Sequence, residues 1–185
     1  MWKRVLFDGA FNQLDARLQE LAATVQDQRG LSATTELLDL RSVAEEVLLG
    51  LRTQVQEAEA TVELDFVAAP TLTYGRVNLR FILHNLLSNA LKFADPDRRP
   101  HIRVRSGLAG PDLPTLTVQD NGLGMVLPGR PAPVFQPFTR QHPEIPGAGV
   151  GMCPVQRIIT GRGGHLEVTS TVGEGTTFTI HWFAA

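Results

Sequence analysis

Apolar residues recur at helical spacing in three stretches of this chain. Leucine and isoleucine repeat every three or four positions over residues 79–92, which predicts a largely buried helix. A second run, from residue 42 to about residue 57, predicts another helix, with Ser42 as its N-cap and Glu45 completing a capping box. A third helical pattern follows the glycine cluster at residues 147–151. These three segments are the candidate helices of one core.

Alternation of apolar and polar residues predicts the strands. The alternating runs lie at residues 61–67, 101–105 and 115–120, and Glu36–Leu40 is typical of an edge strand. Near the end of the chain, two alternating runs flank the glycine turn Gly173–Gly175, which indicates a β-hairpin. One face of this hairpin collects the large apolar residues, and we expect that face to be covered: Leu166, Val168, Phe178, Ile180 and Trp182.

The first 30 residues carry a separate pattern. Apolar side chains alternate at spacings of four and three along a helix expected from about residue 7 to residue 28. The members of this seam are Phe7, Phe11, Leu14, Leu18, Leu21 and Val25. The seam is too long for packing on one small domain, which favours coiled-coil-like pairing with a partner helix; an amphipathic helix on the core is the alternative. Gly30 is the expected helix end, so residues 1–30 and 31–185 are predicted as two units.

The composition limits the classes of function. The chain has 185 residues, 43% of them hydrophobic, which suffices for one core and an appendage. A net charge of −2 gives no reason to expect a nucleic-acid-binding surface. No apolar run approaches the roughly 18 residues of a membrane span, so we expect no direct membrane contact. The single cysteine, Cys153, excludes an internal disulfide and fits a cytoplasmic location.

Polar residues interrupt the most apolar predicted helix along one side. Asn85, Asn89 and Lys92 occupy positions i, i+4 and i+7, which share one face of a helix. Buried amides need polar partners; an amide oxygen can coordinate Mg²⁺, and a lysine can meet a phosphate. The alternative is an asparagine pair that bonds neighbouring backbone, with the lysine extended to solvent. Taken alone, this polar stripe of Asn85, Asn89 and Lys92 favours the alternative. The glycine motifs that follow in the chain strengthen the ligand hypothesis.

A glycine turn follows the strand predicted at residues 115–120. Asp120 begins the run Asp-Asn-Gly-Leu-Gly, so its carboxylate lies at a strand end, where open sheets tend to place ligand groups. A carboxylate at that position can accept a hydrogen bond from the exocyclic amine of adenine. The alternative is an Asx turn, in which the carboxylate caps its own loop. Both interpretations remain open at this point.

Glycine and proline dominate the segment before the third predicted helix. Gly147, Gly149 and Gly151 alternate in the sequence, and glycines before a helix let backbone amides approach a phosphate. The spacing matches neither the dinucleotide-binding fingerprint nor the P-loop. Six of the twelve prolines fall within residues 128–146, which indicates a lid. An ordinary flexible loop is the alternative. Arg140 is a candidate phosphate contact, or else a solvated surface residue.

In their order, these motifs resemble the catalytic ATP-binding domain of two-component sensor histidine kinases. The matching blocks are Asn85-x3-Asn89-x2-Lys92, Asp120-x-Gly122-x-Gly124, Phe135-x-Pro-Phe138, Gly147-x-Gly149-x-Gly151 and Gly173-Glu-Gly-Thr-Thr-Phe178. They look like the family's N, G1, F and G2 boxes and its closing hairpin, over roughly residues 36–183. The seam in the first 30 residues looks like the second helix of the family's dimerisation hairpin.

The resemblance implies a fold and a set of ligands. The implied fold is an α/β two-layer sandwich, a mixed sheet with helices on one face, of the gyrase and histidine kinase type. The implied cofactors are ATP and Mg²⁺, with Asn89 as the metal ligand and with Asn85 and Lys92 at the triphosphate. The other implied contacts are Asp120 at adenine, Gly122 and Gly124 in its pocket, Thr176 beside Asp120, and Gly147, Gly149 and Gly151 at the phosphates.

The resemblance also implies an activity, the transfer of the ATP γ-phosphoryl group to a histidine in two-component signal transduction. Related ATPases carry a glutamate base at the position of Asn85, and an amide cannot serve as that base, which favours phosphoryl transfer over hydrolysis. None of the five histidines lies in the first 83 residues, so we expect the acceptor outside this chain. The implied partners are a second copy bound through the N-terminal helix, a phosphoacceptor histidine domain and a response regulator. A regulatory nucleotide-binding module without catalysis, and an ATPase or protein-serine kinase of the same superfamily, are the alternatives.

Overall fold

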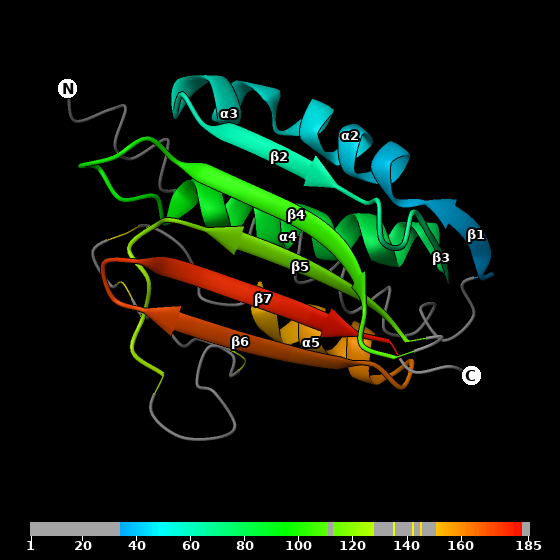
Figure 1. Cartoon of the computed structure of the whole chain (residues 1–185). Helices are drawn as coiled ribbons and strands as arrows, with labels where there is room; N and C mark the ends of the chain where they lie inside the picture. The colour runs from blue at the N-terminus through cyan, green and yellow to red at the C-terminus, as the bar shows by residue number, and fades with distance from the viewer. Residues whose placement is uncertain are drawn as a thin grey trace, which may run out of the picture.

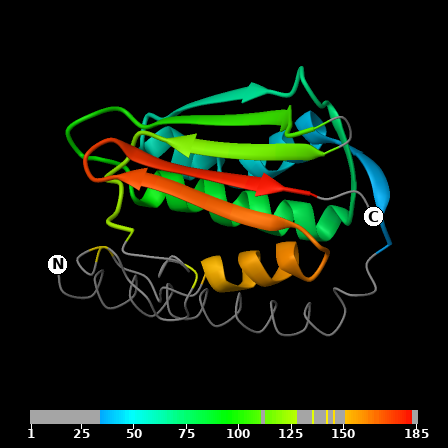
Figure 2. The same cartoon turned by 60° about the horizontal axis from the view of Figure 1, so that its bottom comes forward.

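The computed structural model describes residues 34–110, 113–127, 135, 142, 145 and 151–182. In this part of the chain, helices cover one face of a β-sheet and leave the other face open (Figures 1 and 2). The elements in chain order are β1 (Glu36–Asp39), α2 (Leu40–Gly50), α3 (Arg52–Glu57), β2 (Thr61–Asp65), β3 (Thr71–Tyr74), α4 (Arg76–Lys92), β4 (His101–Leu108), β5 (Pro114–Asp120), α5 (Met152–Thr160), β6 (His165–Thr171) and β7 (Gly175–His181). The predicted two-layer α/β sandwich is confirmed.

The larger sheet combines parallel and antiparallel strand pairs. Its strand order is β2-β4-β5-β7-β6, with β2 and β4 parallel and each later pair antiparallel. Parallel neighbours need a crossover connection, and α4 makes that crossover across the covered face. The short strands β1 and β3 form a separate antiparallel pair, with Glu36 opposite Tyr74. The sequence does not predict β3.

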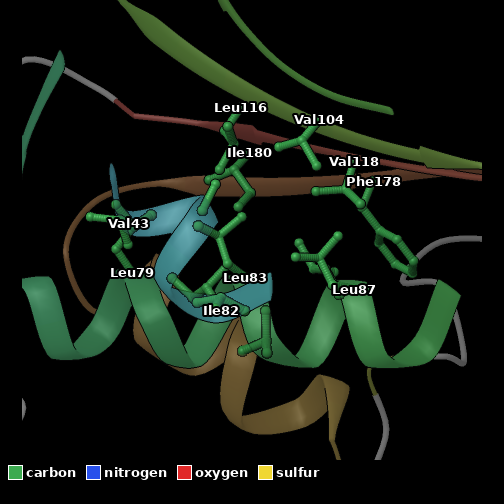
Figure 3. Packing of buried hydrophobic residues seen from close by; sticks show 14 of the residues in the cluster. Val43, Leu79, Ile82, Leu83, Leu87, Val104, Leu116, Val118, Phe178 and Ile180 are labelled. Atoms are coloured by element: carbon green, nitrogen blue, oxygen red, sulfur yellow. The ribbon is translucent and has the colours of Figure 1, made fainter. Parts of the chain in front are cut away.

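The helix α4 carries the centre of the core. Its apolar residues pack against side chains from α2, β4, β5 and β7 (Figure 3). The labelled members of this core are Val43, Leu79, Ile82, Leu83, Leu87, Val104, Leu116, Val118, Phe178 and Ile180. Burial of each such side chain stabilises the fold by about 1.5–3 kcal/mol, so the rotation of α4 about its axis is fixed. The direction of its polar stripe is fixed with it.

The C-terminal segment forms the predicted hairpin with the predicted covered face. Leu166 lies opposite Ile180, and Val168 lies opposite Phe178. Val168 is half-buried, and the other predicted inward-facing residues, including Trp182, are buried. The alternation in the sequence therefore identified both the pairing and the side of the hairpin that meets the helices.

The start of α2 differs from the prediction. The helix begins at Leu40, and the Asp39 carboxylate caps it by accepting a hydrogen bond from the Ser42 N–H at 2.7 Å. Ser42 is therefore not the N-cap, and its predicted capping box with Glu45 does not form. The helix therefore starts earlier than predicted, and its first residue, Leu40, is 2% exposed. The predicted helix over residues 42–57 is also divided at Leu51 into α2 and α3.

Several predictions fall outside the described residues. These are the N-terminal helix, its boundary at residue 30, and the ligand roles of Arg140, Gly147 and Gly149. They stay predictions. Among the residues that the structure describes, no helix combines the length and the apolarity that a membrane crossing requires.

Candidate functional site

The end of β5 places a carboxylate beside the C-terminal hairpin. Oδ1 of Asp120 accepts hydrogen bonds from the N–H of Gly122 at 2.9 Å and from the N–H of Thr176 at 3.1 Å. The first bond is the Asx turn that the sequence allowed, and the second connects β5 to β7. No hydrogen bond from the described part of the chain reaches Oδ2. One oxygen of Asp120 thus serves the fold, while the other is available to a ligand.

The environment of Asp120 perturbs its acidity. Burial raises the pKa of Asp120, while the two backbone N–H donors and the positive charge of Arg98 act in the opposite direction. A carboxylate in such a place gains from a further hydrogen-bond donor, because that donor favours the charged form that burial penalises. The exocyclic amine of adenine is a donor of this kind. Perturbed acids of this type are frequent at functional sites.

Two glycines shape the loop that follows Asp120. A Cβ on Gly122 would overlap the Phe93 carbonyl oxygen, and a Cβ on Gly124 would overlap the Thr171 carbonyl oxygen. Gly124 also has a φ of 66°, in the left-handed region that other residues rarely adopt. The loop therefore lies directly against the end of α4 on one side and against the hairpin on the other.

Thr176 and Ser170 connect this loop to the hairpin. Thr176 is buried, and its hydroxyl lies 2.9 Å from the Ser170 hydroxyl, while its backbone N–H binds Asp120. Ser170 also accepts from the Met125 N–H at 2.9 Å and donates to the Gly175 carbonyl at 2.8 Å. Ser170 was not among the site residues predicted from the sequence. Ser170 follows Leu166 and Val168 on the covered face of β6, and a polar residue in that series is the sequence feature that could have identified it.

Asn121 has a structural role that its position in the glycine motif does not reveal. Its Oδ1 accepts from the His101 N–H at 2.7 Å, and its Nδ2 donates to the Arg99 carbonyl at 3.0 Å. The side chain therefore fastens the end of β5 to the start of β4. Asn121 is engaged by the fold on both its donor and its acceptor side.

The two asparagines of α4 face the start of α5. Asn85 is 5% exposed and donates from Nδ2 to the Phe81 carbonyl at 2.8 Å. Its Oδ1 is so near Gly151 that a Cβ there would lie 3.0 Å away. The Nδ2 of Asn89 lies 3.3 Å from the sulfur of Met152. The donor side of Asn85 thus bonds neighbouring backbone, as in the alternative interpretation, while its amide oxygen and the Asn89 amide face the start of α5.

The third member of the stripe lies at the end of α4. Lys92 is exposed, and its Nζ lies 5.0 Å from the centre of the Phe93 ring. The start of α5 adds the amide groups and the positive dipole end of a helix, which attract anions. Pro154 lies in the first turn of α5, where the missing N–H costs nothing. An amide oxygen and a helix N-terminus therefore lie side by side at the junction of α4 and α5, and Lys92 follows at the end of α4.

This donor set fits a magnesium nucleotide. Within the described residues, no cluster of three histidine, cysteine or acidic side chains is arranged to hold a metal ion. Mg²⁺ in nucleotide sites commonly relies on one or two protein oxygens together with substrate phosphates and water. The amide oxygen of Asn89 can provide the protein ligand, because no hydrogen bond from the described residues occupies it.

Three residues of the proline-rich segment belong to the described part. Phe135 is buried in the core cluster. Nε2 of His142 lies 2.6 Å from the Gly124 carbonyl oxygen, and its ring is 5.7 Å from that of Phe93. The third, Ile145, donates its N–H to the His142 carbonyl at 3.2 Å. Phe135 and His142 thus contact the core and the loop after Asp120.

Comparisons with known proteins agree with this geometry. The family described as "Histidine kinase-, DNA gyrase B-, and HSP90-like ATPase" matches residues 75–185, which include α4, the loop after β5 and the hairpin. The chain is 32% identical over 142 residues to the phytochrome-like protein Cph1 of Synechocystis sp., covering 76% of this chain and 18% of Cph1. It is 33% identical over 153 residues to the sensor histidine kinase AruS of Pseudomonas aeruginosa, covering 78% of this chain and 15% of AruS.

Solved structures show the same arrangement. The mycobacterial sensor histidine kinase MprB superposes with a TM-score of 0.65 at 25% sequence identity, over 80% of this chain and 96% of that chain. This similarity extends over nearly the whole of the MprB structure. The chain spans less than a fifth of the length of Cph1 and of AruS, so it corresponds to one portion of those proteins.

Proposed function

The chain belongs to the family of histidine kinase-, DNA gyrase B- and HSP90-like ATPases, and we propose that it is the ATP-binding catalytic module of a sensor histidine kinase. The observation that carries this proposal is the polar stripe of α4, whose amides face the N-terminal end of α5. An amide ligand for Mg²⁺ beside helix-terminal amides is suited to a triphosphate. Asp120, with one oxygen left for a ligand, is suited to adenine at the other end of the site.

The proposed contacts divide between Mg²⁺, the triphosphate and adenine. Asn89 would hold Mg²⁺, and Asn85 and Lys92 would bind the triphosphate. Asp120 would accept from the exocyclic amine of adenine, in the pocket whose loop depends on Gly122, Gly124 and Thr176. Gly151 would let the start of α5 approach the phosphates, together with Gly147, Gly149 and Arg140 of the predicted lid. Mg²⁺, when bound, would neutralise the charge of the phosphate groups.

The proposed reaction moves one phosphoryl group between two molecules. The bond between the γ-phosphorus of ATP and its bridging oxygen breaks, a bond to an imidazole nitrogen of the acceptor histidine forms, and ADP leaves. Such a transfer depends mainly on positioning and charge neutralisation, so the module itself needs no nucleophile. The amide of Asn85 cannot take a proton from water as a carboxylate would, which favours transfer to the histidine over hydrolysis.

The partners and setting follow from this reaction. We propose a homodimer formed through the N-terminal helix, a histidine-bearing dimerisation domain as acceptor, and a response regulator downstream. We also propose a cytoplasmic location, which the single cysteine and the use of ATP favour.

Transfer of label from γ-labelled ATP tests the proposal. The full chain, Mg²⁺ and a separately supplied histidine-bearing dimerisation domain should place an acid-labile, alkali-stable label on the acceptor, and none on this chain alone. Asn89→Ala should abolish transfer, whereas Ser88→Ala should not, because among the described residues the Ser88 hydroxyl bonds the backbone carbonyl of Asn85 and nothing else. ATP binding without any transfer would indicate the regulatory module instead. Phosphate release without a labelled acceptor would indicate an ATPase.

A further inference from the structure

Arg98 lies between α4 and β4, outside all the motifs of the nucleotide site. Its Nη2 donates to the carbonyl oxygens of Gly122 at 2.8 Å and Gly173 at 2.7 Å. The same nitrogen lies 3.1 Å from a carboxylate oxygen of Asp95. One guanidinium group therefore connects the loop after β5 with the turn between β6 and β7, and Asp95 holds it in place.

The two segments that Arg98 connects are those that hold Asp120. The N–H of Gly122 and the N–H of Thr176, three residues after Gly173, are the donors to Oδ1 of Asp120. A backbone bond from the Gly173 N–H to the Leu123 carbonyl at 2.8 Å also joins the loop to the turn. Arg98 adds a charged donor to this junction, and hydrogen bonds of charged groups are stronger than neutral ones.

We propose that Arg98 is a positioning residue of the adenine pocket: it holds the carbonyl oxygens of Gly122 and Gly173 together and thereby keeps one oxygen of Asp120 on the backbone and the other available to the base. This inference rests on the proposed nucleotide-binding function. It assigns Arg98 an action through Asp120 and no contact with ATP.

The charge of Arg98 gives the proposal a distinctive signature. It lowers the pKa of Asp120 against the larger raising effect of burial. The ionised carboxylate of Asp120 is the form that accepts a charged hydrogen bond from the adenine amine. The affinity for ATP should therefore fall as the pH falls through the pKa of Asp120. Removing the charge raises that pKa and moves the acid limb of the binding profile to higher pH. Substitution of a residue that only stabilised the fold would not change the pH at which ATP affinity falls.

Other charged or titratable groups lie around the same loop. Asp95 pairs with Arg98, Lys92 lies over the Phe93 ring, and His142 bonds the Gly124 carbonyl. Each of them is present in wild type and in every Arg98 variant. A difference in the acid limb between these proteins therefore reports on the substituted residue.

Three variants of the full chain separate position from charge. Arg98→Met removes both the charge and the hydrogen bonds. Arg98→Lys keeps the charge on a shorter side chain. The matched control is Arg99→Met, because the adjacent Arg99 side chain is 82% exposed and pairs with Glu59 at 3.0 Å instead of with the pocket.

The experiment is a calorimetric titration with ATP and Mg²⁺ at a series of pH values from neutral to acid. Arg98→Met should bind ATP about tenfold more weakly at neutral pH, as expected when the charged hydrogen bond between a misplaced Asp120 and adenine is lost, and its acid limb should lie at higher pH. Arg98→Lys should recover part of the affinity and keep the wild-type limb, and Arg99→Met should match wild type.

Wild-type behaviour of Arg98→Met would overturn the proposal, as would weaker binding with an unmoved acid limb. If Arg98→Met does not fold, Arg98→Gln replaces it, since glutamine is neutral but retains an amide donor, and the limb must again move to higher pH. A wild-type chain that binds no ATP would overturn the proposed function itself and this inference with it.

Discussion

At the scale of single residues, Asp120 accepts hydrogen bonds that hold its loop, but its buried charge lowers the stability of the fold. Burial raises the pKa of Asp120 above its ordinary value, so the ionised carboxylate is less stable in the folded chain than in the unfolded chain. The stabilisation that the protonated Asp120 gives is fully present at pH values below the pKa of Asp120 in the unfolded chain. It is lost as the pH rises through the higher pKa of Asp120 in the folded chain. At neutral pH the charged carboxylate therefore lowers stability, and a ligand donor offsets that loss.

The substitution Asp120→Asn separates the two roles. The amide oxygen can accept the same bonds from Gly122 and Thr176 without a buried charge, so the free energy of unfolding at neutral pH should equal or exceed that of wild type. ATP affinity should fall by about 1.5–3 kcal/mol, since a charged hydrogen bond is lost. Urea unfolding and calorimetry measure the two quantities. A variant clearly less stable than wild type would contradict the role assigned to burial, as would a stability difference that grows at acid pH.

Residue types and spacing sufficed to predict Asn85, Asn89 and Asp120 as site candidates. Asn121 and Ser170 were beyond such reasoning, because their partners are distant in the sequence. Asn121 bonds residues 99 and 101, and Ser170 bonds Met125, across strands that only the folded sheet brings together. A local motif cannot specify which of its polar residues meets a ligand and which one fastens the loop.

At the scale of elements, apolar periodicity predicted α4 and the C-terminal hairpin because those segments bury a full face. The strand β3 has four residues and pairs with β1; its alternating run Thr-Leu-Thr-Tyr is short, and the strand was not predicted. The start of α2 was misplaced because Asp39 and Ser42 are both good capping residues at suitable spacing. The spacing alone does not decide between them; in the structure Asp39 is the cap, and Leu40, the first residue of the helix, is buried.

The cap of α2 can be tested with a matched pair of substitutions. Asp39→Ala should cost about 0.5–2 kcal/mol of unfolding free energy, because it removes the side-chain acceptor from the Ser42 N–H. Ser42→Ala keeps that backbone N–H and should change stability by less than about 0.5 kcal/mol. Urea denaturation of both variants checks this. The reverse order of effects would restore Ser42 as the cap.

The junction of α4 and α5 can be tested at Gly151. Its backbone is helical, with φ −64° and ψ −33°, so alanine is compatible with the conformation. The added Cβ would lie 3.0 Å from Oδ1 of Asn85 and would displace that amide. We expect Gly151→Ala to keep its thermal stability within a few degrees and to bind ATP at least about fivefold more weakly. Gly50→Ala, where a Cβ meets nothing within 4 Å, is the control. Unchanged affinity would argue against a phosphate site at this junction.

At the scale of the whole molecule, the candidate site draws on distant parts of the chain. Its groups come from α4, the end of β5, the start of α5 and the hairpin, so they meet only when the complete sandwich has formed. Nucleotide that binds only the folded state must then stabilise it by mass action. Thermal unfolding temperature should therefore rise with ATP concentration in the presence of Mg²⁺. No rise at concentrations that saturate binding would contradict this coupling.

The predicted N-terminal helix concerns assembly. Its apolar seam before Gly30 is longer than one small domain can cover, so we expect the full chain to form a two-fold dimer. A version that starts near Leu31 should be monomeric. Sedimentation of both proteins measures this directly, and a monomeric full chain would refute the dimer.

Adenine recognition by Asp120 is tested by titrating the full chain with ATP and with GTP in the presence of Mg²⁺. At the position of the exocyclic amine of adenine, guanine presents a carbonyl oxygen, which would leave Oδ2 of the Asp120 carboxylate without a donor from the base. The expected loss is about 1.5–3 kcal/mol, so GTP should bind roughly 10- to 150-fold more weakly than ATP. Asp120→Asn should reduce this preference. Equal affinities of the wild-type chain for ATP and GTP would contradict the assignment of the pocket.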